Sequence, residues 1–181
     1  TFTFFSVVIA FAYAVYLHFW VKRQPAINNR IIEVSDLIHA GANTFMRKEY
    51  ISLARFAGVA AVLILVFLPS PIWDGNIVDN LSMMTAYLAG TILSAIAGKI
   101  GILVATQANS RAAEGAQRGL KPAFLIGFRG GAVMGLAVVG FCLLGVMAVL
   151  MITGDASVLL GFSFGASSLA LFAKAGGGIF T

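Results

Sequence analysis

Five long apolar segments follow one another along the 181-residue chain, separated by short stretches of charged residues, proline or glycine. About 20 apolar residues in a helix cross a hydrocarbon core of roughly 30 Å. The pattern therefore predicts an all-α integral membrane protein with five transmembrane helices in a single membrane domain over residues 1–181. The predicted spans are residues 2–20, 51–68, 81–105, 123–152 and 157–180. The fourth, about 45 Å long, is expected to tilt or to project into water.

Residues 28–46 are too polar to span a membrane, but their apolar positions have a helical spacing. These positions are Ile31, Val34, Ile38 and Phe45. The spacing predicts a helical extension of the second span on the cytoplasmic side. The alternative is an amphipathic helix on the membrane surface. Such anchors are rich in basic residues, whereas here Glu33 and Asp36 accompany Arg30.

The composition excludes a soluble protein. Hydrophobic residues make up 60% of the chain and charged residues 10%, against about 25% charged in soluble domains. The net charge of +5 indicates basic cytoplasmic loops rather than a surface for nucleic acid. The single cysteine, Cys142, allows neither an internal disulfide nor a cysteine-based metal cluster.

The basic residues predict the orientation of the spans, because cytoplasmic loops are rich in Lys and Arg. They fall between spans one and two and between spans three and four, whereas the other two loops contain Asp74, Asp79 and Asp155 and no basic residue. We therefore expect the N-terminus outside and Thr181 at the cytoplasmic face.

The two ends of the sequence suggest a piece of a longer protein. Residue 1 is Thr rather than Met, and the chain stops at Thr181 without a polar tail. The first apolar segment has no basic stretch before it and no small-residue cleavage site, so it is expected to be a span rather than a cleaved signal peptide.

Small residues at four-residue spacing in the fourth span form a GxxxGxxxG series of Gly127, Gly131 and Gly135, which predicts close helix packing. Four charged residues lie at or inside the predicted spans: Arg55, Lys99, Arg129 and Lys174. A charge in lipid costs at least about 2.5 kcal/mol, so each must snorkel, pair or face water. Snorkelling is expected for the first three.

Few residues are suited to catalysis or metal binding. His18 and His39 lack further ligands for a metal site and are expected to be interfacial or packing residues. The carboxylates are too scattered to hold Mg²⁺ against a phosphate, so we expect no catalytic, substrate-binding or metal site in this chain and no hydrolysis by it alone. Asn80 begins a glycosylation sequon that is weak so close to a span.

Four stretches nevertheless resemble the membrane-bound, ion-translocating inorganic pyrophosphatases. They are residues 41–50 (GANTFMRKEY), 105–109 (ATQAN, as a third-helix exit), 128–135 (FRGGAVMG) and 165–181 (GASSLALFAKAGGGIFT). The resemblance covers nearly the whole chain in order and is most specific at the C-terminal end.

The resemblance implies a homodimer in which each protomer has about sixteen transmembrane helices in two concentric rings. Pyrophosphate would be hydrolysed at the cytoplasmic face and H⁺ or Na⁺ pumped outward. The resemblance also implies Mg²⁺, and possibly K⁺, as cofactors. It places the segment that binds Mg²⁺ and pyrophosphate just after Thr181, and therefore outside this chain.

Lys174 is the candidate ion-gate residue, because the family usually has Arg at this position in a gate below the hydrolytic site. Lys keeps the charge but lacks the planar, bidentate guanidinium. It lies sixteen residues after Val158, roughly 24 Å along the span. Surrounding small residues favour a helix packed among helices, where the ammonium needs a carboxylate partner that the family provides on a later helix.

Two hypotheses of different classes remain. In the first, the chain is the N-terminal part of a pyrophosphate-driven ion pump. In the second, it is a self-standing five-span structural or channel subunit that shares only packing motifs with that family. A sequence beyond Thr181 with Lys and spaced Asp residues would favour the first.

Overall fold

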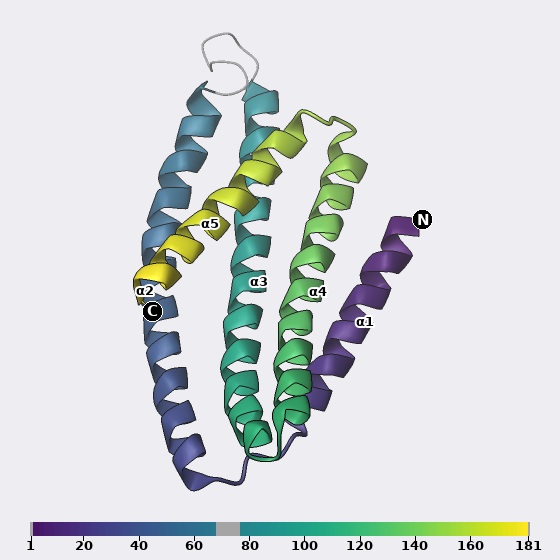
Figure 1. Ribbon diagram of the computed structural model, residues 1–181. Helices are drawn as coiled ribbons and strands as arrows, with labels where there is room; N and C mark the ends of the chain where they lie inside the picture. The colour runs from purple at the N-terminus through teal and green to yellow at the C-terminus, as the bar shows by residue number, and fades with distance from the viewer. Residues whose placement is uncertain (1, 68–76, 181) are drawn as a thin grey trace. The chain divides into compact units, whose positions relative to one another are not determined.

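The computed structural model describes residues 2–67 and 77–180, and all of its regular elements in these ranges are α-helices. The helices are α1 (Phe2–Lys22), α2 (Asn29–Phe67), α3 (Ile77–Gln117), α4 (Leu120–Thr153) and α5 (Val158–Phe180) (Figure 1). Asp74 and Thr181, whose positions relative to the membrane are predicted above, lie outside the described residues.

Two helices extend well beyond the apolar segments. The predicted extension at residues 28–46 belongs to α2, which is continuous from Asn29 to Phe67. Residues 105–109, which resemble the family's third-helix exit, lie inside α3, because this helix continues to Gln117. Residues 106–117 are polar but include Ala, Gln, Arg and Glu, which favour helix, so the helix outlasts the apolar segment.

The connections between α3, α4 and α5 depend on two glycines with positive φ. Gly119 (φ 130°) lies between α3 and α4, and Gly154 (φ 65°) ends α4 with a bond from its N–H to the Leu150 carbonyl. The Asp155 carboxylate then accepts bonds from the Ser157 N–H (2.8 Å) and hydroxyl (2.7 Å) ahead of α5. These hydrogen bonds lower the pKa of Asp155.

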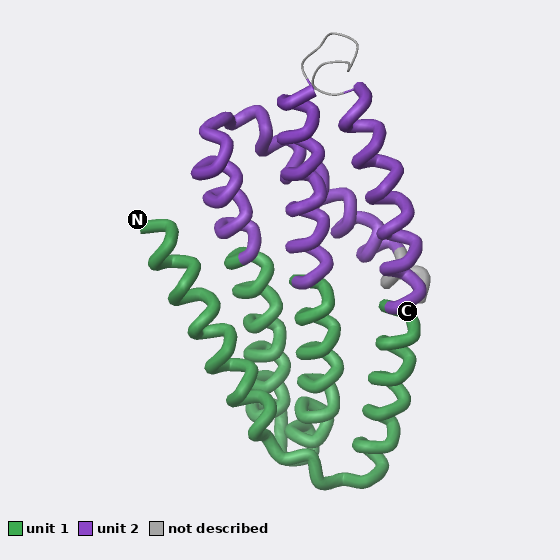
Figure 2. The backbone as a smooth tube through the Cα atoms, turned by 180° about the vertical axis from the view of Figure 1, so that it is seen from behind, with its two compact units in different colours: residues 1–46, 97–140 green, residues 47–96, 141–181 purple. Residues whose placement is uncertain are grey.

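The chain divides into two compact units (Figure 2). Unit 1 comprises residues 1–46 and 97–140, and unit 2 comprises residues 47–96 and 141–181. In unit 1, buried residues of α1, α3 and α4 form two clusters: Ala14, Leu17, Val104 and Val133 in one, and Val21, Ala108 and Ile126 in the other.

In unit 2, glycines allow α5 to lie directly against α3. A Cβ atom at Gly165 would overlap the Tyr87 carbonyl oxygen, and one at Gly161 would lie 2.5 Å from the Met83 carbonyl oxygen. The Ser94 hydroxyl also donates to the Ala166 carbonyl at 3.1 Å. Lipid gives little hydrophobic drive for helix association, so such close backbone contact matters for this pair.

The GxxxGxxxG series does not have the packing role predicted for it within the described residues. A Cβ atom at Gly127, Gly131 or Gly135 would meet nothing within 4 Å. The neighbouring Gly130 instead faces the Ala108 side chain of α3. The direction in which α4 turns its small residues depends on its tertiary contacts, and the spacing alone does not reveal it.

Candidate functional site

Lys174, the predicted gate residue, lies on the last part of α5 whose side chains are described. It is exposed, and it makes no ion pair or hydrogen bond with any described residue. Two residues earlier on α5, the Phe172 ring packs on Phe56 of α2 with the ring centroids 4.6 Å apart. The Lys174 ammonium group has no carboxylate partner among the described residues.

The other three charges differ in their surroundings. Arg55 and Lys99 are exposed, which suits the predicted snorkelling. For Arg129 snorkelling stays a prediction, and the structure adds a contact: its guanidinium carbon lies 3.9 Å from the centroid of the Trp20 ring. This cation–π contact joins α4 to α1 and supplies a partner that the sequence spacing did not indicate.

The histidines and carboxylates do not come together. No group of three or more His, Cys, Asp or Glu side chains that could hold a metal ion occurs within residues 2–67 and 77–175. His39 Nδ1 is paired with Asn43 Nδ2 at 2.8 Å. Glu114 is buried and its Oε2 accepts a bond from the Asn28 N–H at 3.1 Å, so it fixes the start of α2 to α3.

Asn80 has a structural role that excludes its use as a glycan acceptor. It is fully buried, and its Nδ2 donates to the Leu65 carbonyl of α2 at 2.8 Å. The sequon pattern is therefore incidental.

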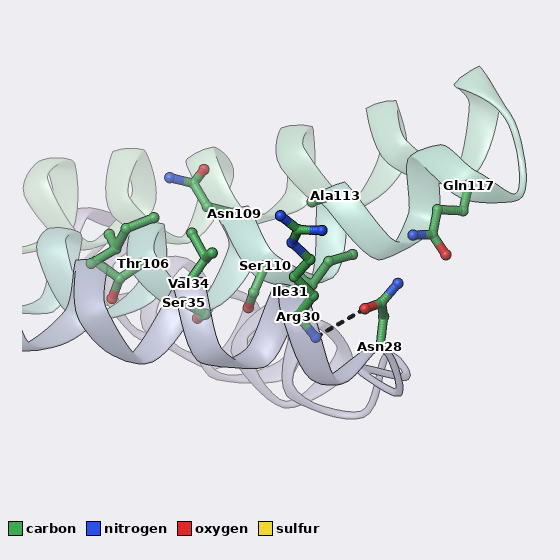
Figure 3. Close-up of a pocket in the computed structure, with 11 residues that line it drawn as sticks. Asn28, Arg30, Ile31, Val34, Ser35, Thr106, Asn109, Ser110, Ala113 and Gln117 are labelled. Carbon is green, nitrogen blue, oxygen red and sulfur yellow. Dashed lines mark hydrogen bonds between the residues drawn. The ribbon is translucent and has the colours of Figure 1, made fainter.

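An open cavity of about 500 Å³ with a mainly apolar lining surface lies in unit 1 and was not predicted from the sequence (Figure 3). The start of α2 contributes three polar residues to its lining: Asn28, Arg30 and Ser35. The end of α3 contributes four: Thr106, Asn109, Ser110 and Gln117. Its apolar lining consists of Ile31, Val34, Ile38 and Ala113. The signal that could have revealed it is the helical spacing of small polar residues in α3 beyond the predicted span.

All five helices are long and apolar enough to cross a membrane. Many large apolar side chains are exposed, among them Phe124, Phe128 and Leu171, which suits contact with lipid or with further helices. The chain is therefore part of a multi-pass membrane protein.

The family model described as inorganic H⁺ pyrophosphatase matches residues 8–181, and the chain belongs to this family. The resemblance predicted from its sequence is confirmed. The chain is 38% identical to the K⁺-insensitive pyrophosphate-energized proton pump of Methanosarcina mazei, over 96% of this chain and 25% of that protein.

Relatives of both transport types match the chain. It is 33% identical to the K⁺-stimulated pyrophosphate-energized sodium pump of Thermotoga maritima, over 89% of this chain and 24% of that protein. It is 30% identical to the pyrophosphate-energized membrane proton pump 3 of Arabidopsis thaliana, over 99% of this chain and 25% of that protein. The chain thus spans about a quarter of the length of the curated relatives it matches.

Proposed function

We propose that the protein containing this chain is a primary ion pump that couples hydrolysis of pyrophosphate to transport of H⁺ or Na⁺. The observation that supports this function best is the family match over residues 8–181, together with relatives named as pyrophosphate-energized proton and sodium pumps. A match in order over that length argues against a subunit that shares only helix-packing motifs.

Within this proposal, the described residues contribute membrane helices and one candidate ion-gate residue. They do not contribute the hydrolytic site. They contain no cluster of carboxylates that fits Mg²⁺, so Mg²⁺ and pyrophosphate are assigned to other segments of the protein. Lys174 is the gate candidate, because the resemblance places it where the family usually has the Arg of the ion gate; its exposure on α5 is compatible with a partner on another helix. A homodimer and a dependence on K⁺ remain predictions from the resemblance.

The test of the pump is coupled transport by the full-length protein. Purified protein in sealed vesicles should release phosphate from pyrophosphate in the presence of Mg²⁺ and, in the same preparation, accumulate H⁺ or Na⁺ inside. Chelation of Mg²⁺ should stop both. A folded full-length protein that releases no phosphate would refute the proposal.

The proposed orientation places the connection between α3 and α4 at the cytoplasmic face and the connection between α4 and α5 outside. In the full-length protein without other reactive cysteines, Arg118→Cys and Asp155→Cys should be labelled from opposite sides of sealed vesicles by a membrane-impermeant maleimide. Labelling of both from one side would contradict the orientation.

A further inference from the structure

The connection between α1 and α2 is bound at both of its ends by one turn of α3. The Arg111 guanidinium donates through Nη2 to the Lys22 carbonyl at 3.3 Å, at the last residue of α1. Glu114 Oε2 accepts from the Asn28 N–H at 3.1 Å, at the residue before α2. The two side chains are one turn apart on α3 and therefore lie on the same face of that helix. All four residues belong to unit 1.

The bond from Arg111 completes the hydrogen bonding at the end of α1. A helix leaves its last four carbonyls without partners inside the helix. The carbonyls of residues 19–21 are bonded locally, by the N–H groups of Arg23 and Gln24 and by the Gln24 side chain. The Lys22 carbonyl receives its bond from another helix instead. A guanidinium at this place also faces the negative end of the α1 dipole, which is favourable.

The bond to Glu114 completes a capping box at the start of α2. In a capping box, the side chain of the N-cap residue binds an N–H of the first turn, and a Glu or Gln three residues later binds the N-cap N–H. Asn28 makes the first bond, because its side-chain oxygen accepts from the Arg30 N–H at 3.0 Å. The residue three positions later is Ile31, whose side chain has no acceptor. Glu114 of α3 takes that role, with its carboxylate at the positive end of the α2 dipole.

Beyond Asn28, the packing of α2 on α3 in unit 1 is loose. The open cavity lies between these two segments (Figure 3), and Val34 and Ile38, which line it, are about half-exposed. Within the part of the chain that the structure describes, no side chain of residues 29–38 makes a hydrogen bond or ion pair with α3. The start of α2 therefore depends on Glu114 for its polar attachment to α3.

We propose that Arg111 and Glu114 form a clamp that fastens the α1–α2 connection and the first turn of α2 to α3, and that loss of either side chain releases both ends of the connection. The connection is short, and Pro25 within it has a fixed φ, so displacement of one end is transmitted to the other. The clamp presents a cation to the end of one helix and an anion to the start of the next. It does not require the proposed pump function.

The experiment measures hydrogen–deuterium exchange of the full-length protein in nanodiscs by mass spectrometry. Glu114→Leu should speed exchange of residues 28–32 about tenfold or more, because a hydrogen bond to a charged group is lost. Arg111→Leu should speed exchange of residues 23–24 about threefold, because its bond is long and exposed. Arg111→Leu should also speed exchange of residues 28–32, at the end of the connection that Arg111 does not touch. This last effect is specific to a clamp.

Three further variants serve as controls. Glu114→Gln keeps an acceptor oxygen for the Asn28 N–H and should retain most of the protection. Glu33→Leu and Arg118→Leu remove an exposed carboxylate and an exposed guanidinium from the same unit. Both should leave exchange of residues 23–32 at the wild-type rate.

Faster exchange confined to the connection and the first turn of α2 supports the clamp. The proposal is overturned if Glu114→Leu or Arg111→Leu leaves residues 28–32 at the wild-type rate, because the two side chains would then act as separate caps or not at all. It is also overturned if either variant speeds exchange equally in residues 158–170 of α5, which belong to unit 2. The side chain would then support the whole protein rather than the connection.

Discussion

Gly165→Leu is expected to prevent α5 from docking on α3 in unit 2. Even the first side-chain carbon at this position would overlap the Tyr87 carbonyl oxygen and lie 3.0 Å from the Thr91 hydroxyl. That hydroxyl itself donates to the Tyr87 carbonyl at 2.9 Å, so both obstacles are fixed on α3. Because a backbone atom cannot rotate away, the loss of stability should lie at or above the upper end of the range for an overpacked core, about 3 kcal/mol or more.

The measurement is the thermal stability and recovery of the full-length protein in mild detergent. The control is Gly58→Leu on α2 in the same unit, where an added Cβ atom would meet nothing within 4 Å. It should melt close to the wild-type temperature. A Gly165→Leu protein that is recovered in normal yield and melts with the wild type would show that α5 does not pack on α3 as described.

Lys174→Ala is expected either to uncouple ion transport from pyrophosphate hydrolysis or to abolish both. The ammonium is exposed on α5, two residues after the Phe172–Phe56 contact, and has no carboxylate partner among the described residues. Under the proposed function, its carboxylate partner lies on another helix of the pump, so the variant removes one member of that pair. The rate of ion accumulation should therefore fall at least about tenfold, whether hydrolysis persists or is lost with it.

Two further variants separate a gate from a general need for charge at the membrane boundary. Lys174→Arg, which introduces the residue usual in the family, should retain hydrolysis and transport, because it keeps the charge and gains a second pair of donors. Lys99→Ala removes an exposed lysine from α3 and should leave both activities unchanged. Native hydrolysis and transport by Lys174→Ala would instead assign Lys174 to simple snorkelling.

Local features of the sequence were sufficient to predict the helices. The apolar segments are long, and a helix satisfies every backbone hydrogen bond within itself, so the membrane leaves few alternatives to five spans. The helix ends were harder to predict. Apolar character ends near residue 105, whereas α3 continues to Gln117 because its polar residues still favour helix.

The candidate site was also only partly predictable from the sequence. Residues 165–181 indicated the family directly, since a run of specific residues can be recognised without any knowledge of contacts. The cavity was missed because its lining comes from two segments about 80 residues apart, around Arg30 and Ser110. The partner of Arg129 was missed for the same reason, since Trp20 lies on a different helix.

The sequence by itself thus determined the membrane class, the five helices and the family, because hydrophobic length, charge bias and motif identity are properties of consecutive residues. Only the tertiary structure decided which glycines touch another helix. Gly127, Gly131 and Gly135 have the typical packing spacing but meet no other described residue, whereas Gly161 and Gly165 lie against carbonyl oxygens of α3. Spacing places residues on one face of a helix, but the rotation of that helix against its neighbours depends on contacts between segments distant in the chain.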